Sequence, residues 1–445
     1  MLPELQRVLQ RLAPLKDWEA RGRARMAEEV STAPCRDLCR RLGYPQHRYR
    51  VVHISGSKGK GTVGALLGVA LGAAGWRVGV MSSPHVEHLT ERLRLGGTPI
   101  DEPSLAAALA AAAAARDAAA AEGTAGRAAS WFDVFVAGSF EAMARGRADW
   151  AVVECGLGGR RDSTNVVASL AAVLTSVERE HTEVLGEAVR QIAREKAAIV
   201  RAGAALLAAV DGDAAAEVRR VARERRAGSV TLLPPAADAL GEGGNVALAR
   251  LVLDELGRRG ARVAGGATRL HGGLLSARLV ARAAAWLPAR QESRAAACGT
   301  PVLLDGAHTP RSVRALVARV RGGAPPPAAA GGGAPVVLLG MMEAKEAEEI
   351  VKGVAEAAPR HVVCCSLDAR GDAAASGSFP PRELARLARG LGVASSAFDD
   401  AAEALECALQ LARESRAWVL VIGSFRLCGY VRKRMVPLPE CDEVD

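Results

Sequence analysis

The stretch Val51–Val63 decides the fold class of the N-terminal half, and it runs Val-Val-His-Ile-Ser-Gly-Ser-Lys-Gly-Lys-Gly-Thr-Val. It begins with a short apolar run, Val51–Ile54, which is typical of a buried strand. Glycines dominate the turn that follows, and Thr62 begins an Ala-rich apolar stretch to Ala74 that predicts a helix. A strand, a glycine-rich turn and a helix in this order form a phosphate cradle, because turn N–H groups and the helix N-terminus converge on an anion.

Two of the chain's seven lysines, Lys58 and Lys60, lie between these glycines. Lys60 can place a point charge on the outer phosphates of a nucleotide, and the Thr62 hydroxyl can reach a magnesium ion. Gly61 separates this lysine from the threonine, so the spacing differs from the standard P-loop, and an ordinary strand-to-helix turn is the alternative interpretation. The predicted nucleotide-binding residues of the turn are Gly56, Ser57, Lys58, Gly59, Lys60, Gly61 and Thr62.

Length and composition limit the possible classes of protein. A chain of 445 residues with 49% hydrophobic residues predicts two or three domains with real cores. The net charge of +9 suits an enzyme of anionic substrates; no basic run is interleaved with aromatic residues, so we expect no nucleic-acid partner. The Ala-rich stretch Leu105–Ala121 contains Arg116 and Asp117, and it predicts a surface helix rather than a membrane span. We therefore expect no membrane partner and a monomer.

The cysteines and the N-terminus bear on the compartment. The nine cysteines are scattered, which favours reduced thiols in an intracellular protein. Glu4 and Asp17 interrupt the N-terminus early, so it resembles neither a signal peptide nor an Arg- and Ser-rich presequence. We expect a cytoplasmic location, with a mitochondrial one left open.

Apolar strands that end in polar residues follow the cradle. Trp76–Met81 leads into Ser82–His85, and Asp149–Glu154 ends in a carboxylate followed by the glycine-rich loop Cys155–Asn165. Ligands bind at the carboxyl edge of open parallel sheets, where a carboxylate can hold magnesium beside a nucleotide. Glu91–Arg94 is expected to lie in a loop.

Strands and helices alternate throughout, which predicts an α/β fold with parallel sheets and helices on both faces. Further predicted strands are Ala171–Val177, Ala204–Val210, Pro301–Leu304, Val336–Leu339, Val362–Ser366 and Trp418–Ile422. Predicted helices are Leu2–Leu15, Met26–Leu42, Phe132–Met143, Glu187–Val200 and Pro310–Val320. We expect a surface insert over 322–335 and a domain boundary near Pro288, at the polar break Arg290–Gly299.

Five stretches together resemble the folylpolyglutamate synthase/dihydrofolate synthase family of the Mur ligase superfamily, from about Tyr44 to Arg432. They are Gly56–Thr62, Ser83–His85, Glu154–Asn165, Ile192–Ala197 and Leu304–His308. The resemblance implies an N-terminal P-loop-type parallel-sheet ATPase domain that binds ATP and the pterin, over 1–290. It also implies a smaller C-terminal Rossmann-like glutamate ligase domain over 291–445.

The implied activity is that of an ATP-dependent ligase, which joins L-glutamate to a pteroate or folate carboxylate through an acyl phosphate. Dihydropteroate and tetrahydrofolate polyglutamates both remain open as substrates, with a slight preference for dihydropteroate. A non-catalytic or diverged nucleotide-binding protein of the same fold is the alternative. Intact Lys60, Glu154, His181 and Lys196 argue against that alternative.

The resemblance also assigns roles to single residues. Lys60, His181 and Lys196 are the implied catalytic residues, with Lys196 carried as a carbamate. Ser83, Glu154 and His181 are the implied ligands of magnesium, in two ions. Asn245, Arg290, Asp305 and His308 are implied nucleotide contacts, and Phe132 and Asp162 fall where the family holds the pterin.

Four positions depart from the family pattern. Glu180 stands before His181 where aspartate is usual, and Ala197 follows Lys196 where glycine is usual. Ala289 replaces a glycine before Arg290, and Thr309 replaces an asparagine after His308. None of these changes removes an implied metal ligand, but those at Ala289 and Thr309 lie at the implied domain junction, so effects on closure or nucleotide affinity and a weakly active or diverged ligase stay open.

Overall fold

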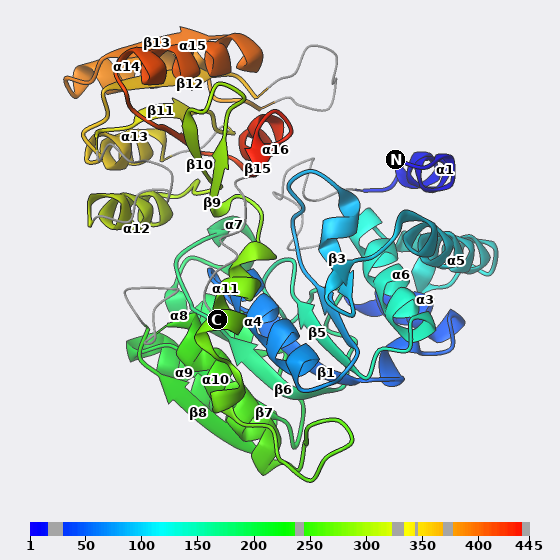
Figure 1. The fold of residues 1–445 in the computed structure, drawn as a ribbon. Helices are drawn as coiled ribbons and strands as arrows, with labels where there is room; N and C mark the ends of the chain where they lie inside the picture. Colours follow the sequence, from blue (N-terminus) through cyan, green and yellow to red (C-terminus); the bar gives the residue numbers. More distant parts are fainter. Residues whose placement is uncertain (17–29, 236–243, 323–332, 343–345, 368–376, 438–445) are drawn as a thin grey trace. The chain divides into compact units, whose positions relative to one another are not determined.

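The computed structural model describes residues 1–16, 30–235, 244–322, 333–342, 346–367 and 377–437 (Figure 1). The chain forms two compact units, Met1–Trp286 and Leu287–Asp445. The sequence placed the boundary at 290/291, near Pro288. Each unit is an α/β domain, as the alternation of strands and helices predicted.

Unit 1 is built on an eight-stranded sheet of order β4-β3-β2-β5-β1-β6-β7-β8. The six strands from β2 to β8 are parallel, whereas β3 and β4 are antiparallel to their neighbours. The strands are β1 (Arg50–Ser55), β2 (Val78–Met81), β3 (Leu93–Leu95), β4 (Thr98–Pro99), β5 (Trp150–Glu154), β6 (Ser169–Leu174), β7 (Ala205–Ala209) and β8 (Ser229–Leu233). Because β1 is flanked by β5 and β6, the turns after these three strands meet at one edge.

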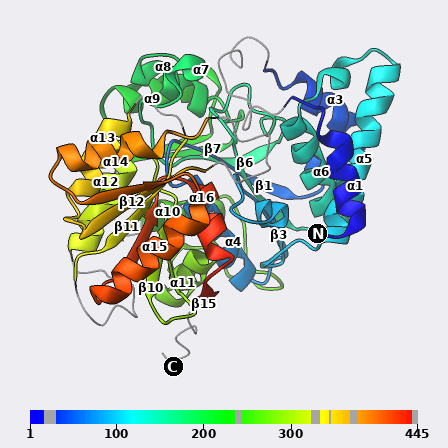
Figure 2. The same ribbon diagram turned by 90° about the horizontal axis from the view of Figure 1, so that it is seen from above.

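Helices cover both faces of this sheet. On one face lie α4 (Lys60–Ala73) and α10 (Asn245–Arg258), with α11 (Ala277–Ala285) against α4. The helix α4 approaches closely through glycine, since a Cβ on Gly68 would lie 2.7 Å from Val80 Cγ2. On the other face lie α8 (Val189–Ala197) and α9 (Gly212–Glu224) over β6 and β7, and a helical group over β1, β2 and β5 (Figure 2). That group is α1 (Pro3–Leu12), α3 (Ala33–Arg41), α5 (Glu102–Ala121) and α6 (Trp131–Arg145).

The helix α5 covers the stretch Leu105–Ala121, which was expected to form a surface helix, and it buries one face while residues such as Asp117 stay exposed. It packs against α6 and α1, and Leu105 and Leu109 are buried in the core that these helices share. Among the described residues, α5 is the helix long and apolar enough to cross a membrane by length and composition. These criteria are weak evidence, and 44% of its most apolar window is buried within the protein. The alanines allow α5 and α6 to pack closely.

Unit 2 is a smaller layered domain with a seven-stranded sheet of order β13-β12-β11-β14-β10-β9-β15. Its strands are β9 (Arg290–Ala295), β10 (Pro301–Asp305), β11 (Val336–Leu339), β12 (His361–Cys365), β13 (Ser395–Phe398), β14 (Val419–Ile422) and β15 (Val436–Pro437). The strands from β13 to β10 are parallel, and β9 is antiparallel to both of its neighbours. This arrangement agrees with the predicted Rossmann-like domain.

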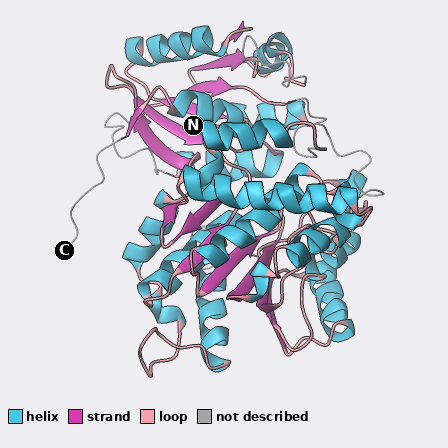
Figure 3. Cartoon of the chain, turned by 90° about the vertical axis from the view of Figure 1, so that its right-hand side faces the viewer, coloured by secondary structure: helices cyan, strands magenta, loops and turns pink. Residues whose placement is uncertain are grey.

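Helices also cover both faces of the second sheet. The helices α12 (Pro310–Arg321), α13 (Ala347–Ala355) and α14 (Pro381–Gly390) bury apolar residues against one face, and α15 (Ala401–Glu414) and α16 (Phe425–Arg432) lie on the other. Figure 3 shows the strands of each unit between layers of helices.

Some local predictions were wrong. Arg290–Gly299 was taken as a polar break, but Arg290–Ala295 forms β9, paired with β10 and β15. Glu91–Arg94 was taken as a loop, but Leu89–Arg92 is a 3₁₀ turn and Leu93 begins β3. Both strands are only partly buried, and such strands carry little hydrophobic alternation, which explains both errors.

Helix ends also differ from prediction. The helix predicted over Met26–Leu42 begins at Ala33, where Pro34 occupies the first turn, and 17–29 lie outside the described residues. The helix predicted over Glu187–Val200 covers Val189–Ala197, and the one predicted over Leu2–Leu15 covers Pro3–Leu12. Most of the insert expected over 322–335 also lies outside the described residues.

Candidate active site

The predicted phosphate cradle lies where β1 turns into α4. Gly59 has φ of +85° and precedes Lys60, the first residue of α4, so the helix begins two residues before the predicted start at Thr62. The first N–H groups of a helix lack intrahelical acceptors, and the helix dipole places partial positive charge there. The turn and the start of α4 therefore offer free N–H groups at the place where the sequence predicted phosphate binding.

Asn245 lies against this turn from the start of α10. A Cβ on Gly59 would lie 2.5 Å from Asn245 Oδ1 and 2.8 Å from its Nδ2, so the close contact requires glycine. Asn245 is 7% exposed, and its Nδ2 has no hydrogen-bond partner among the described residues. Asn245, a predicted nucleotide contact, thus borders the cradle and has a buried amide N–H group that could donate a hydrogen bond to a ligand.

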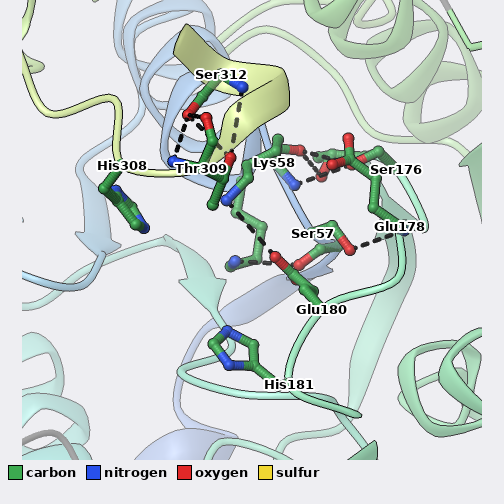
Figure 4. Close-up of polar contacts among 12 residues, drawn as sticks. Ser57, Lys58, Ser176, Glu178, Glu180, His181, His308, Thr309 and Ser312 are labelled. Carbon is green, nitrogen blue, oxygen red and sulfur yellow. Dashed lines mark hydrogen bonds and ion pairs between the residues drawn. The ribbon is translucent and has the colours of Figure 1, made fainter. Parts of the chain in front are cut away.

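The segment after β6, Thr175–Glu178, holds the cradle turn, and the sequence had not marked it. The Lys58 carbonyl accepts hydrogen bonds from the Thr175 hydroxyl and from Ser176 Oγ, and Lys58 N–H donates to Ser176 Oγ at 2.9 Å. Glu178 N–H donates to Ser57 Oγ at 3.0 Å (Figure 4). A Cβ on Gly56 would lie 2.0 Å from Thr175 Oγ1, so only glycine permits this approach.

Two lysine side chains converge on one backbone carbonyl of the cradle. Gly56 O accepts a hydrogen bond from Lys60 Nζ at 3.0 Å and from Lys196 Nζ at 2.9 Å. Lys60 Nζ also lies 4.0 Å from Glu154 Oε1. Lys60, Lys196 and Glu154, predicted from three separate motifs, are therefore brought together.

Glu180 links the lysines from another loop. Its Oε1 lies 3.3 Å from Lys196 Nζ, and its Oε2 lies 3.5 Å from Lys58 Nζ (Figure 4). Burial works to raise the Glu180 pKa, but the charges of Lys196 and Lys58 outweigh burial and lower it to about 2. The sequence had noted Glu180 only as a departure from the family pattern, yet it is the anion that neutralises this cationic group.

Lys196 is a buried lysine in unusual surroundings. It is 1% exposed, and burial, followed by the nearby charge of Lys60, lowers its pKa to about 8, although Glu180 opposes the change. The helix α8 reaches this place because the glycine-rich loop after β5 packs on it: Arg160 N–H donates to Glu195 O at 2.9 Å. A Cβ on Gly159 would lie 2.9 Å from Lys196 O.

Ser83 and Glu154, two predicted metal ligands, are neighbours at the ends of β2 and β5. Ser83 N–H donates to Glu154 Oε2 at 3.4 Å, and Glu154 is 4% exposed. Hydroxyl and carboxylate oxygens are ligands that Mg²⁺ accepts, and Mg²⁺ commonly binds one or two carboxylates together with substrate phosphates. The residues present therefore fit such an ion.

The third predicted ligand, His181, does not complete a protein-only cluster. No group of three or more His, Cys, Asp or Glu side chains suited to a metal occurs among the described residues. His181 has a left-handed backbone with φ of +49°, and its Nδ1 lies 3.9 Å from Glu183 Oε1. Figure 4 shows it next to Glu180 in the chain and below the lysine contacts of that residue.

Phe132 and Asp162, the predicted pterin contacts, meet at Gly156. A Cβ on Gly156 would lie 2.7 Å from Phe132 Cζ and 3.4 Å from Asp162 Oδ2. Asp162 Oδ2 accepts a hydrogen bond from Leu157 N–H at 2.9 Å, and Oδ1 accepts from Thr164 N–H at 3.0 Å and from the Thr164 hydroxyl. Burial raises the Asp162 pKa, against these donors. Asp162 thus organises the glycine-rich loop that faces Phe132.

The predicted contacts in unit 2 form a separate group at the end of β10. Asp305 Oδ1 accepts from Ala307 N–H at 2.8 Å, and Oδ2 accepts from Gln291 N–H at 3.1 Å. Burial raises the pKa of Asp305, while the charge of Arg290 opposes that change. The Arg290 guanidinium lies 5.1 Å from the centre of the Phe425 ring. The His308 ring is edge-on to the same Phe425 ring, with 6.0 Å between the two ring centres.

The departures Ala289 and Thr309 have structural explanations. Ala289 has φ of +53°, a left-handed conformation that glycine adopts without strain, which accounts for the glycine that is usual there. Thr309 caps α12, with its hydroxyl accepting from Ser312 N–H at 3.4 Å (Figure 4). Threonine can therefore serve as a helix cap where asparagine is usual.

The C-terminal part of the chain matches a known protein family. Residues 289–425 match the family model described as Mur ligase, glutamate ligase domain, which identifies the fold of unit 2. The chain is similar to "Dihydrofolate synthase/folylpolyglutamate synthase" of Bacillus subtilis, with 33% identity over 207 residues, which are 46% of this chain and 48% of that protein. The match thus spans about half the length of this relative.

Two solved structures share the fold over nearly the whole chain. "E.coli FolC in complex with DHPP and ADP" has a TM-score of 0.75 and 23% identity, covering 96% of this chain and 97% of that one. The bifunctional folylpolyglutamate synthase/dihydrofolate synthase of Yersinia pestis, complexed with AMPPNP and Mn ion, has a TM-score of 0.74 and 24% identity, with the same coverage of 96% and 97%. At 23% and 24% identity, these structures show that the chain has the same two-domain α/β fold.

Proposed function

We propose that this protein is an ATP-dependent ligase that joins the amino group of L-glutamate to the carboxylate of a pteroate or folate. The observation that carries the proposal is the convergence of Lys60 and Lys196 on the Gly56 carbonyl, beside the buried carboxylate of Glu154. Such a group combines a cation for phosphate oxygens, Lys60, with an acid for a divalent ion, Glu154. Relatives and structures of the same fold carry the names of such ligases.

The chemistry divides into two transfers. A carboxylate oxygen of the substrate attacks the γ-phosphorus of ATP, and the bond between that phosphorus and the β-phosphate oxygen breaks. ADP departs, and the substrate carboxylate has become an acyl phosphate. The neutral amine of glutamate then attacks the acyl carbon, loses a proton, and phosphate departs as the amide forms. Both transfers depend on positioning and on neutralising phosphate charge, which the cradle N–H groups and Lys60 would supply.

Ser83, Glu154 and His181 are the residues that would hold magnesium in this proposal. When bound, the ion would neutralise phosphate charge and orient the phosphates. The support is the pairing of Ser83 with Glu154 and the oxygen chemistry of both. The manganese in the Yersinia pestis structure is consistent with a divalent ion at such a site.

For Lys196 we propose a carbamate, formed on the neutral amine. A pKa lowered to about 8 raises the fraction of neutral amine at physiological pH, which favours this modification. As an ammonium, Lys196 is paired with Glu180. Carbamylation would replace that attraction by repulsion between two anions, so it requires Lys196 to leave Glu180.

The residues around each proposed site indicate which part of the substrates would bind there. Phe132 offers an aromatic surface and faces the loop that Asp162 organises, which would suit a flat pterin ring. Asn245 borders the cradle and would meet the nucleotide in unit 1. Arg290, Asp305 and His308 are the nucleotide contacts that we propose within unit 2.

The experiment that tests the function supplies ATP, magnesium and L-glutamate together with either dihydropteroate or tetrahydrofolate, and measures ADP release. ADP formation that requires both glutamate and one pterin supports the ligase, and the pterin that works identifies the substrate. Nucleotide binding without turnover on either pterin would favour the non-catalytic alternative. Product mass determines how many glutamates are added.

A further inference from the structure

A buried histidine on the cradle strand contacts the substrate loop. His53 lies on β1, two residues before Ser55, and it is fully buried at 0% exposure. Its Nε2 lies 2.8 Å from Thr164 Oγ1 and 3.2 Å from Cys155 Sγ. Both partners belong to the glycine-rich loop that follows β5. A histidine in an otherwise apolar strand was the signal in the sequence, and it was not recognised as part of the site.

The direction of these hydrogen bonds can be deduced. The Thr164 hydroxyl donates to Asp162 Oδ1, because a carboxylate is the strongest acceptor it meets. Its oxygen lone pairs then face His53 Nε2, which must carry the proton to make the contact at 2.8 Å. Burial, together with the charge of Arg201, lowers the His53 pKa to about 3, so the ring is neutral and Nδ1 is bare. Consistently, Nδ1 has no hydrogen-bond partner among the described residues.

The result is a directed chain from β1 to the loop: His53 donates to Thr164, and Thr164 donates to Asp162. A second contact between β1 and the loop lies two residues further along the strand, where the Ser55 hydroxyl donates a hydrogen bond to Gly158 O at 2.5 Å. The same strand leads into Gly56 and the lysines of the cradle. One strand therefore fixes both the phosphate cradle and the loop against which Phe132 packs.

We propose that His53 is a positioning residue, which holds Asp162 and the loop Cys155–Asn165 in the geometry that binds the pterin part of the substrate. This inference rests on the proposed ligase function. It assigns the role to the Nε2–H group and not to the bulk of the ring. His53 itself touches no reacting atom.

The test compares four substitutions in steady-state kinetics. His53→Leu removes the donor and should raise the KM for the pterin substrate about tenfold, with the KM for ATP within about twofold of the wild type. His53→Gln places an N–H near Nε2 and should recover most of the affinity. His53→Asn places its amide near Nδ1, which has no partner, and should behave like His53→Leu. Thr164→Val breaks the same chain and should not add to His53→Leu.

A matched control separates positioning from loss of any buried polar group. Ser139, on α6, has a fully buried hydroxyl without a hydrogen-bond partner among the described residues. Ser139→Ala should leave both KM values unchanged. Thermal unfolding of every variant shows which remain folded, and the contrast between His53→Gln and His53→Asn is read only from folded protein.

The outcomes distinguish this inference from the proposed function. A wild type that neither binds nor turns over a pterin overturns both. An active wild type whose His53→Leu form keeps its pterin KM overturns the inference alone. The inference is also overturned if His53→Asn restores affinity as well as His53→Gln does, or if all His53 variants change the two KM values equally.

Discussion

In each unit, a strand of the sheet ends in an acidic residue. The surroundings of these two carboxylates differ. Asp305, at the end of β10, binds backbone N–H groups of its own unit through both oxygens. Glu154, at the end of β5, lies beside Ser83 and 4.0 Å from the Lys60 ammonium. The same sequence signal, an apolar strand followed by an acid, thus leads to a carboxylate that braces its loop in one unit and to one placed among cations and a hydroxyl in the other. Only the second arrangement offers the chemistry of a metal and phosphate site.

The largest effect should come from removing the cation beside Glu154. Lys60→Ala should lower ATP turnover about 10³-fold, because the outer phosphates lose a charge that acts mainly in the transition state. Lys352, which pairs with Glu349 on α13, provides a matched control. Lys352→Ala should keep full ADP formation. Full turnover in a folded Lys60→Ala protein would remove Lys60 from the phosphate site.

Substitutions of Lys196 should give the next largest effect. They test whether Lys196 becomes an anionic carbamate in addition to the carboxylate of Glu154. If it acts as a carbamate, Lys196→Ala should lose most activity, and acetate should restore part of it. Lys196→Arg should be nearly inactive, because a guanidinium cannot carry the carbamate and would repel magnesium. Carbamylation needs the neutral amine, so stimulation by carbon dioxide should grow as the pH rises toward and through about 8. An active arginine variant without a carbon dioxide response would contradict the carbamate and favour a cationic role.

The direct comparison is the pair Glu154→Gln and Asp305→Asn. Glu154→Gln should lower activity about tenfold or more and raise the magnesium concentration needed, because a neutral amide is a poorer ligand for a hard cation. Asp305→Asn should leave the magnesium requirement unchanged. It should instead lower stability by about 1–3 kcal/mol, since one amide oxygen cannot replace two acceptors. Magnesium titrations of ADP release and thermal unfolding measure the two effects. Equal magnesium requirements in wild type and Glu154→Gln would exclude Glu154 as a ligand.

The sequence predicted those parts of the site that depend on local patterns. The cradle and the carboxylate at the end of β5 each follow from an apolar run with glycine or charge at its end, whereas the lysine on α8 was assigned from the family resemblance. Other parts depend on which loops become neighbours. Glu180 contacts Lys58 and Lys196, and Thr175 and Ser176 hold the cradle turn, because β6 lies beside β1. No local pattern encodes those contacts.

The fold shows the same division. Parallel strands such as β1 and β5 were predicted because burial on both faces makes them apolar. The strand β9 was missed, since only partial burial and pairing with β10 and β15 define it. Ala289 was recognised from the sequence as a departure, but its cause, a positive φ, required the structure.

The smallest predicted effect concerns that alanine in unit 2. Ala289 is fully buried at φ of +53°, its N–H donates to Glu292 Oε2 at 2.9 Å, and its carbonyl accepts from Gly306 N–H. These bonds hold the residue in a conformation that costs an L-amino acid about 1–2 kcal/mol. Ala289→Gly removes that strain but loses a buried methyl group, about 0.8 kcal/mol, and gains unfolded-state entropy. The terms nearly cancel, so the variant should unfold within about 0.5 kcal/mol of the wild type.

A matched substitution isolates the strain. Ala412 is equally buried but lies within α15, where glycine relieves nothing and costs about 1 kcal/mol in helix propensity in addition to the lost methyl group. Ala412→Gly should therefore be clearly destabilised, and Ala289→Gly should exceed it in stability by at least about 1 kcal/mol. Denaturant unfolding of both variants measures that difference. An equal loss of stability at the two positions would show that the backbone of Ala289 is not strained, and that the glycine usual at this position serves another purpose.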